Sequence, residues 1–348
     1  MGSATAPVAR WRLNGFRMGL KNTAEPRHAA DIRGRFVRLP SVFRDWITAD
    51  GSSEYPAEPG RYHLYVSRAC PWAHRTVILR GLKRLEGIVG MTVVDPIRDH
   101  RGWRFSNAEG CEPDPVNGFE FLYEAYLSTD PEYASRVTVP LLWDKQTSRI
   151  VNNESSEIIR MFNSAFEEWG DASIDFYPGD LRDQIDEINA IVYTNVNNGV
   201  YKTGFAGTQE AYAATVFPLF ETLEMIEQRL VENRYLIGDA LTEADWRLFP
   251  TLVRFDAVYV GHFKCNLKRL VDFPNLWAYT REIYQMPHIA ETVDMDHIKR
   301  HYYLTHGSLN PSGVVPVGPD IDFDEPHGRG EGAAAAEKTA AQAEGGAP

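Results

Sequence analysis

Residues 70–75, which read CPWAHR and closely follow the apolar run Tyr62–Val66, are the part of the chain best suited to chemistry. Proline at a first helical position predicts that a helix begins at Cys70. The unpaired N–H groups and the positive end of the helix dipole would then surround the Cys70 sulfur. Arg68 and Arg75 add positive charge nearby. We therefore expect a pKa below that of free cysteine and a nucleophilic thiolate.

A plain structural role is the alternative for Cys70, because free cysteine often packs as a small buried hydrophobe. The position three residues later holds Ala73, so the segment lacks the second cysteine of a C-x-x-C dithiol. A mixed disulfide formed on Cys70 would have to be resolved by an external thiol. The residues alone thus point to a small thiol as co-substrate.

Two further segments could bind such a thiol. Pro140 begins an apolar run, where proline fits a strand start and a cis bond would be a strong local feature. In thioredoxin-like folds such a proline exposes the backbone of the residue before it, here Val139. Glu154 and Ser155 precede an amphipathic run, whose helix start would offer N–H groups to a carboxylate. A simple helix N-cap is the alternative for this pair.

The elements that must position these residues change type once along the chain. Residues 61–166 predict strand, helix, strand, a long loop over 96–136, a hairpin and a helix, which is an α/β thioredoxin-like domain. A linker over 167–180 precedes an all-helical domain over 181–304. Its helices are expected at 181–196, 209–231, 242–260, 276–285 and 287–303. We expect residues 1–60 to form an irregular arm and the acidic residues 305–348 a disordered tail.

Composition excludes several functions. The net charge of -12 argues against nucleic acid as a partner, and no apolar run reaches the roughly 20 residues that span a membrane. The chain has only three cysteines, Cys70, Cys111 and Cys265. Their odd number and wide spacing favour a reducing compartment, the cytoplasm. Because no cysteine or histidine pair has zinc-ligand spacing, we expect no metal.

The chain resembles the glutathione transferases, and most closely their Xi class, the glutathionyl-hydroquinone reductases. The resemblance runs from about residue 36 to residue 303 and includes the Cys-Pro, Val-Pro and Glu-Ser segments. It also includes NNGVYKTGFA at 197–206, LIGDALTEAD at 236–245, LVRFDAVY at 252–259 and IYQMP at 283–287. It implies the glutathione-transferase fold, a thioredoxin-like domain followed by an all-α domain, and a homodimer.

The resemblance also implies a role for each matching position. Cys70 matches the catalytic cysteine, and glutathione is the implied co-substrate. The positions that match contacts to glutathione are Trp103, Arg136, the backbone of Val139, Glu154 and Ser155. The positions that match the aromatic substrate site are Tyr201, Tyr259 and Tyr302. Without the resemblance, nothing would select these three among the 16 tyrosines of the chain.

The expected reaction is glutathione-dependent reduction of glutathionyl-hydroquinones to hydroquinones through a Cys70–glutathione mixed disulfide. The substrate would be a small aromatic thioether. Two alternatives stay open at this point. One is an omega-like thiol transferase that removes glutathione from protein cysteines or reduces dehydroascorbate. The other is a non-catalytic protein that binds aromatic ligands.

Overall fold

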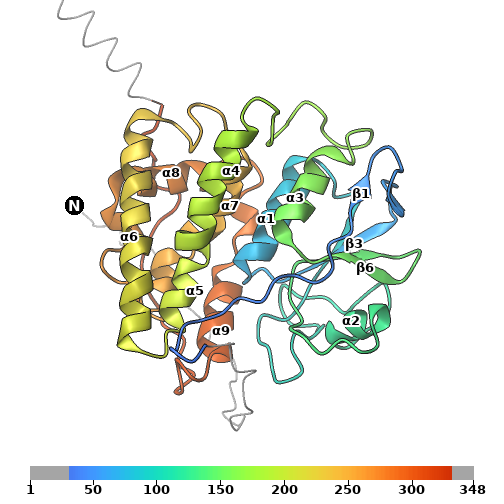
Figure 1. Ribbon diagram of the computed structural model, residues 1–348, viewed down its shortest axis with the longest axis horizontal. Coiled ribbons are helices and arrows are strands. Elements are labelled where there is room, and N and C mark those ends of the chain that lie inside the picture. The colour runs from blue at the N-terminus through green and yellow to red at the C-terminus, as the bar shows by residue number, and fades with distance from the viewer. Residues whose placement is uncertain (1–30, 331–348) are drawn as a thin grey trace, which may run out of the picture.

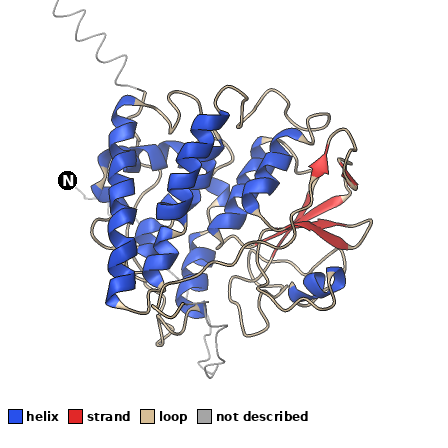
Figure 2. Ribbon diagram, in the orientation of Figure 1, coloured by secondary structure: helices blue, strands red, loops and turns tan. Residues whose placement is uncertain are grey.

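The computed structural model describes residues 31–330, so the first part of the expected arm and the end of the expected tail lie outside the described residues. A four-stranded sheet lies at one end of the molecule and a group of helices at the other (Figure 2). This is the expected order, an α/β domain followed by a helical one. The linker expected at 167–180 lies between α3 (Ser155–Ser164) and α4 (Arg182–Ile191), and the domain division itself stays a prediction.

The sheet has the strand order β4-β3-β5-β6. Strand β3 (Tyr62–Val66) is buried throughout and pairs parallel with β4 (Gly90–Val93) and antiparallel with β5 (Leu141–Asp144), which pairs in turn with β6 (Arg149–Asn152). Helix α1 (Pro71–Leu82) and α3 pack side by side between the sheet and the helical domain (Figure 1). The end of β3 therefore delivers the chain directly to the interface between the two domains.

The helical domain is built around α6, the longest helix described between residues 31 and 330 (Figure 1). Helix α1 packs against α7 of this domain. The helices are α4, α5 (Gly199–Gly204), α6 (Gln209–Glu232), α7 (Glu243–Leu252), α8 (Pro274–Tyr284) and α9 (Met295–Thr305).

Four expected element bounds were wrong. The helix expected over 287–303 begins only at Met295, after a short 3-10 turn at Ala290–Thr292. The helix expected over 242–260 ends at Leu252, and the chain continues through a π-helical turn at Phe255–Tyr259. Pro250 lies in the last turn of α7 and cannot donate a backbone hydrogen bond there. The helix expected over 181–196 likewise gives way to a π-helical turn at Val192–Asn197. The loop expected over 96–136 contains the short helix α2 (Tyr123–Thr129), which lies beside β6.

The expectation of a disordered tail from residue 305 was wrong for residues 306–330. Phe323 is 8% exposed and packs on the rings of Trp277 and Tyr284, at 5.2 and 5.0 Å between centroids. Arg329 donates to a carboxylate oxygen of Glu282 at 2.6 Å. Composition alone could not reveal that one aromatic ring and one arginine attach this polar segment to α8. The expectation for residues 331–348 lies outside the described residues.

Residues 31–45, here called the strap, run from the helical domain to the sheet (Figure 1, dark blue). On the helical side, Gly207 donates its N–H to the Gly34 oxygen at 2.8 Å. On the sheet side, Asn153 donates to the Phe43 oxygen at 3.1 Å. Two short parallel strands follow, β1 (Ile47–Thr48) and β2 (Tyr55–Pro56). The strap thus fastens one domain to the other.

A capping box begins α7. The Thr242 side chain accepts from the Ala244 N–H at 3.3 Å, and Asp245 accepts from the Thr242 N–H at 2.8 Å. Asp245 also accepts from the Leu236 N–H at 3.0 Å and the Tyr279 hydroxyl at 2.8 Å. The Thr242 hydroxyl also lies 3.2 Å from Asp245, so one buried carboxylate accepts from four donors.

We predict that Thr242→Ala lowers the free energy of unfolding by about 1 kcal/mol, the usual cost of a lost cap. Asp245→Ala should cost more, roughly 3 kcal/mol, because it leaves buried donors without a partner. Urea unfolding followed by circular dichroism measures both values. Val231→Ala, at a site 62% exposed, is the control and should change little. Equal, small effects in all three variants would contradict this account of α7.

Candidate active site

Cys70 is the N-cap of α1, with φ -79° and ψ 120°, and Pro71 takes the first helical position. Its backbone N–H donates to the Ser67 oxygen at 3.1 Å, which closes the turn between β3 and α1. The expected placement of the sulfur at a helix start is therefore confirmed. The side chain is partly exposed and lines a pocket between the two domains.

Arg254 from the helical domain holds the turn that precedes Cys70. This arginine is fully buried and donates to the backbone oxygens of Ala69 at 3.0 Å and Arg68 at 2.8 Å. It also donates to the Pro250 oxygen at 2.7 Å and contacts His74 Nδ1 at 3.0 Å. The guanidinium is an obligate donor, so His74 Nδ1 accepts. His74 is thereby held as the neutral tautomer whose Nε2–H donates to the Thr292 hydroxyl at 2.7 Å.

The expectation of a lowered pKa for the Cys70 thiol was wrong. Burial raises the pKa of the Cys70 thiol, although the N–H groups of Ala73 and Trp72 and the charges of Arg254 and Arg38 lower it. Desolvation disfavours the charged form, and here it outweighs the helix start. The thiol lies 3.5 Å from the Val139 oxygen, to which it can donate while protonated. Burial by the residues around the pocket therefore opposes ionisation of the Cys70 thiol.

The segments expected to bind the thiol meet beside Cys70. The Val139–Pro140 bond is cis, as the sequence suggested. Glu154 is the N-cap of α3, where its carboxylate accepts from the Ser156 N–H at 3.2 Å and the Ser41 hydroxyl at 3.0 Å. Burial opposes its charge, yet these bonds and the charge of Arg75 hold the pKa of Glu154 below its usual value. Glu154 is thus an ionised group in the pocket wall as well as a helix cap.

Positive charge also gathers in the pocket, where Arg38, Arg98 and Arg136 are among the lining residues. Trp103 is 4% exposed and stacks on His301 at 5.0 Å, and the Arg98 guanidinium lies 5.0 Å from the Trp103 ring centroid. Burial, together with the charges of Arg38 and Arg98, lowers the pKa of Arg136 to about 10. The guanidinium groups of Arg38, Arg98 and Arg136 therefore line one pocket, which favours an anionic ligand.

The three tyrosines form a hydrogen-bonded cluster. The Tyr302 hydroxyl lies 2.6 Å from the Tyr201 hydroxyl and 3.1 Å from the Tyr259 hydroxyl. Burial raises the pKa of all three phenols, so they stay protonated and able to donate. Tyr201 and Tyr302 line the pocket. Tyr259 does not line it and instead contacts the Tyr302 hydroxyl. The other pocket-lining residues expected from the sequence are Cys70, Trp103, Arg136, Val139, Glu154 and Ser155.

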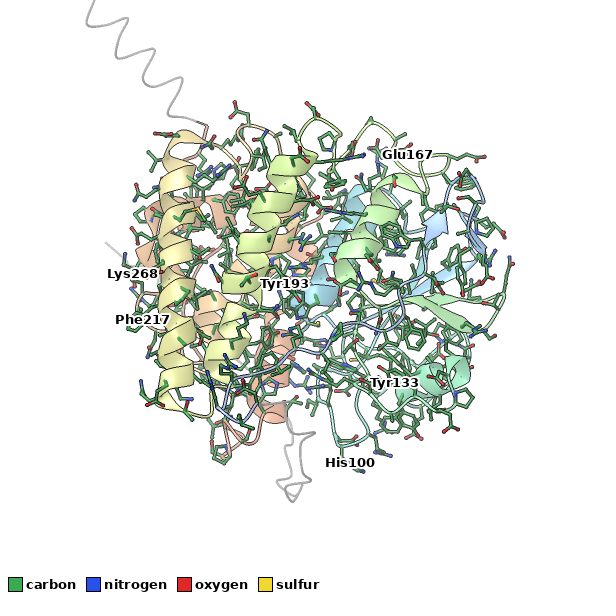
Figure 3. All side chains as sticks on the ribbon, in the orientation of Figure 1. His100, Tyr133, Glu167, Tyr193, Phe217 and Lys268 are labelled. Carbon is green, nitrogen blue, oxygen red and sulfur yellow. The ribbon has the colours of Figure 1, made fainter. Side chains whose placement is uncertain are left out.

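Sequence reasoning missed several residues of the pocket wall. Arg38 and Ser41 come from the strap, which shows no periodic pattern. Tyr193 lies in the π-helical turn that follows α4, and Tyr133 lies toward α2 (Figure 3). Both line the pocket together with His301. The motifs that carry the family resemblance do not include these residues. These residues come from segments that are far apart in the sequence, and only the fold brings them together in one pocket.

Residues 31–330 contain neither a candidate metal site nor a candidate membrane-spanning helix. No group of three or more histidine, cysteine, aspartate or glutamate residues there could hold a metal ion. No helix in this part of the chain has the length and apolar character needed to cross a membrane.

We predict that the rate at which iodoacetamide alkylates Cys70 rises with pH, with a midpoint above the value of about 8.5 for free cysteine. Burial raises the folded-state pKa, so the reactive thiolate appears only at higher pH. Peptide mass spectrometry assigns the modified residue, and a small cysteine peptide serves as the reference. A midpoint near or below neutrality would contradict this prediction.

Family models match both halves of the chain. The glutathione S-transferase N-terminal domain matches residues 69–165, and the C-terminal domain matches residues 209–282. The first range contains the Cys70 turn and the start of α3, and the second contains α6, α7 and most of α8. The first range therefore includes Cys70, Trp103, Val139 and Glu154 of the pocket, whereas Tyr201 and Tyr302 lie outside the second range.

Individual relatives agree with this assignment. The glutathionyl-hydroquinone reductase YqjG of Escherichia coli K12 is 54% identical over 85% of this chain and 92% of its own. Its glutathione-bound structure has a TM-score of 0.81 over 82% of this chain and 96% of that chain. The glutathione S-transferase omega-like 2 of Schizosaccharomyces pombe is 47% identical over 82% of this chain and 94% of its own.

A solved structure indicates the class. The glutathione S-transferase Xi of Phanerochaete chrysosporium is 51% identical, with a TM-score of 0.80 over 82% of this chain and 98% of that chain. Together with the order of the two domains and the cysteine at the start of α1, these similarities settle the relationship. The chain belongs to the Xi class of the glutathione transferase family.

Proposed function

We propose that this protein is an enzyme that reduces glutathionyl-hydroquinones to hydroquinones, with glutathione as the reductant. The observation that carries the proposal is one pocket that Cys70 lines together with groups suited to a peptide thiol and groups suited to an aromatic ring. The same pocket contains the start of α3, the arginines Arg38, Arg98 and Arg136, and the phenols Tyr201 and Tyr302. The relative YqjG, named a glutathionyl-hydroquinone reductase, supports the choice of substrate.

The glutathione moiety would occupy the side of the pocket formed by Val139, Glu154 and Ser155. An ionised Glu154 can accept from the ammonium of the γ-glutamyl group. The start of α3 and the Ser155 hydroxyl can donate to the neighbouring carboxylate. Arg136 and Trp103 would contact the remainder of the peptide. This arrangement would place the glutathione sulfur near Cys70 and the attached ring near the tyrosines.

In the first step, the Cys70 thiolate attacks the glutathione sulfur of the thioether. A sulfur–sulfur bond forms and the carbon–sulfur bond breaks. This step is feasible when the ring carbon already carries a proton in a keto tautomer, since the released electron pair then restores the aromatic ring. A second glutathione attacks the mixed disulfide, which frees Cys70 and yields oxidised glutathione.

The tyrosine cluster suits the tautomer step. Because burial keeps the three phenols protonated, they can donate to the ring oxygens without becoming charged. Tyr302 is central, since it joins the other two hydroxyls. Such preorganised donors stabilise charge that develops on an oxygen in a site with little water.

The omega-like relative supports a second candidate, a thiol transferase that acts on protein mixed disulfides. It would use the same Cys70 chemistry, but it gives the cluster of three phenols no task. A rate on glutathionylated protein that greatly exceeds the rate on glutathionyl-hydroquinone would favour it. We further propose a homodimer and a cytoplasmic location, which gel filtration of the purified protein and fractionation of cells would test.

The proposal predicts that Cys70→Ser abolishes hydroquinone release from glutathionyl-hydroquinone in the presence of excess glutathione. Serine cannot form the mixed disulfide, so the first step has no nucleophile. Chromatography of the free hydroquinone measures the rate. Cys111→Ser is the matched control and should retain activity. Undiminished turnover by the Cys70 variant would refute the proposed chemistry.

We also predict graded losses in the tyrosine cluster. Tyr302→Phe removes the hydroxyl that contacts both others and should lower kcat by about 100-fold. Tyr259→Phe removes one contact and should lower kcat by about tenfold, roughly one hydrogen bond. Both variants should still form the Cys70 mixed disulfide with oxidised glutathione, measured by intact mass. Equal rates in both variants and the wild type would remove the phenols from the mechanism.

A further inference from the structure

Arg38 lies in the pocket beside two aromatic side chains, Tyr201 and Trp72, and it lines this pocket together with Cys70. Its guanidinium carbon is 4.7 Å from the ring centroid of Tyr201 and 4.8 Å from that of Trp72, the second residue of α1. Its charge acts on both the Cys70 thiol and the Tyr201 phenol. The strap therefore places a cation against Trp72 and Tyr201 in the pocket that Cys70 also lines.

Arg38 differs from Arg254, the other arginine whose charge acts on both Cys70 and Tyr201. The Nε, Nη1 and Nη2 atoms of Arg254 all have partners in the domain interface. Arg38 uses Nε to bond the Asn198 side chain, whereas its Nη2 is buried and has no hydrogen-bond partner. A buried donor without a partner costs free energy, and a ligand that accepts from it recovers that cost.

The charge balance of the first step calls for such a group. Before attack, the negative charge is on the Cys70 sulfur. When the carbon–sulfur bond of the keto tautomer breaks, the electron pair moves into the ring and the charge appears on the ring oxygen. That phenolate then takes up a proton to give the hydroquinone. A cation that lies close to both positions can hold the charge throughout this transfer.

We infer that Arg38 binds the ring oxygen that becomes negative when the carbon–sulfur bond breaks. The inference rests on the proposed function and deepens it. It makes Arg38 a catalytic residue and defines the substrate as a thioether whose ring carries a hydroxyl conjugated with the sulfur-bearing carbon. The neutral tyrosines donate hydrogen bonds to the same region, and Arg38 supplies the countercharge that they lack.

The test compares two reactions of the same sulfur in the wild type and in Arg38→Gln. One substrate is glutathionyl-hydroquinone. The other is the mixed disulfide of glutathione and 2-mercaptoethanol, whose leaving group has no ring oxygen. The ratio of the two kcat values cancels any effect of Arg38 on Cys70 itself. We expect the ratio of thioether to disulfide turnover to fall roughly 100-fold, as for the loss of an oxyanion donor.

Arg35→Gln is the matched control, because Arg35 lies on the same strap with its side chain 57% exposed. It should leave the ratio unchanged. Arg38→Lys keeps the positive charge and should restore part of the thioether-to-disulfide ratio. If Arg38→Gln fails to fold, the ratio measured for Arg38→Lys against the wild type is the test. An unchanged ratio in both Arg38 variants would overturn the inference alone. A wild-type protein that releases no hydroquinone would overturn the proposed function, and the inference with it.

Discussion

The contact on which the site depends is the one between Arg254 and the turn that precedes Cys70. A single buried guanidinium binds the backbone oxygens of Arg68 and Ala69 and the imidazole of His74. It therefore joins the helical domain to the end of β3 and the start of α1 at the position of the sulfur. Since the pocket is formed by both domains, this contact helps to fix its geometry, together with the packing of α1 against α7. The strap adds a second connection between the same two domains.

Enclosure has two opposite effects on the chemistry. It raises the pKa of Cys70 and so disfavours the thiolate. It also raises the pKa values of Tyr201 and Tyr302, which keeps them as neutral donors, and it strengthens the fields of the surrounding arginines. The arginines offset part of the cost that burial places on the thiolate. The same burial therefore opposes ionisation of Cys70 and keeps the neighbouring phenols neutral and able to donate.

The sequence was sufficient for the elements whose signals are local. Proline after Cys70 and the apolar run of β3 placed the sulfur correctly, and the family resemblance selected tyrosines that indeed form one cluster. The direction of the Cys70 pKa shift was wrong because desolvation depends on residues far away in the chain. Arg38 was missed because the strap has no periodicity, and the order of residues 306–330 depends on the burial of Phe323.

The most direct measurement is the intact mass of the protein after one turnover with glutathionyl-hydroquinone and no free glutathione. The account predicts one glutathionyl group per chain, located on Cys70 by peptide mapping, and an equal amount of released hydroquinone. Hydroquinone released without any adduct, or an adduct on Cys111 or Cys265, would contradict it.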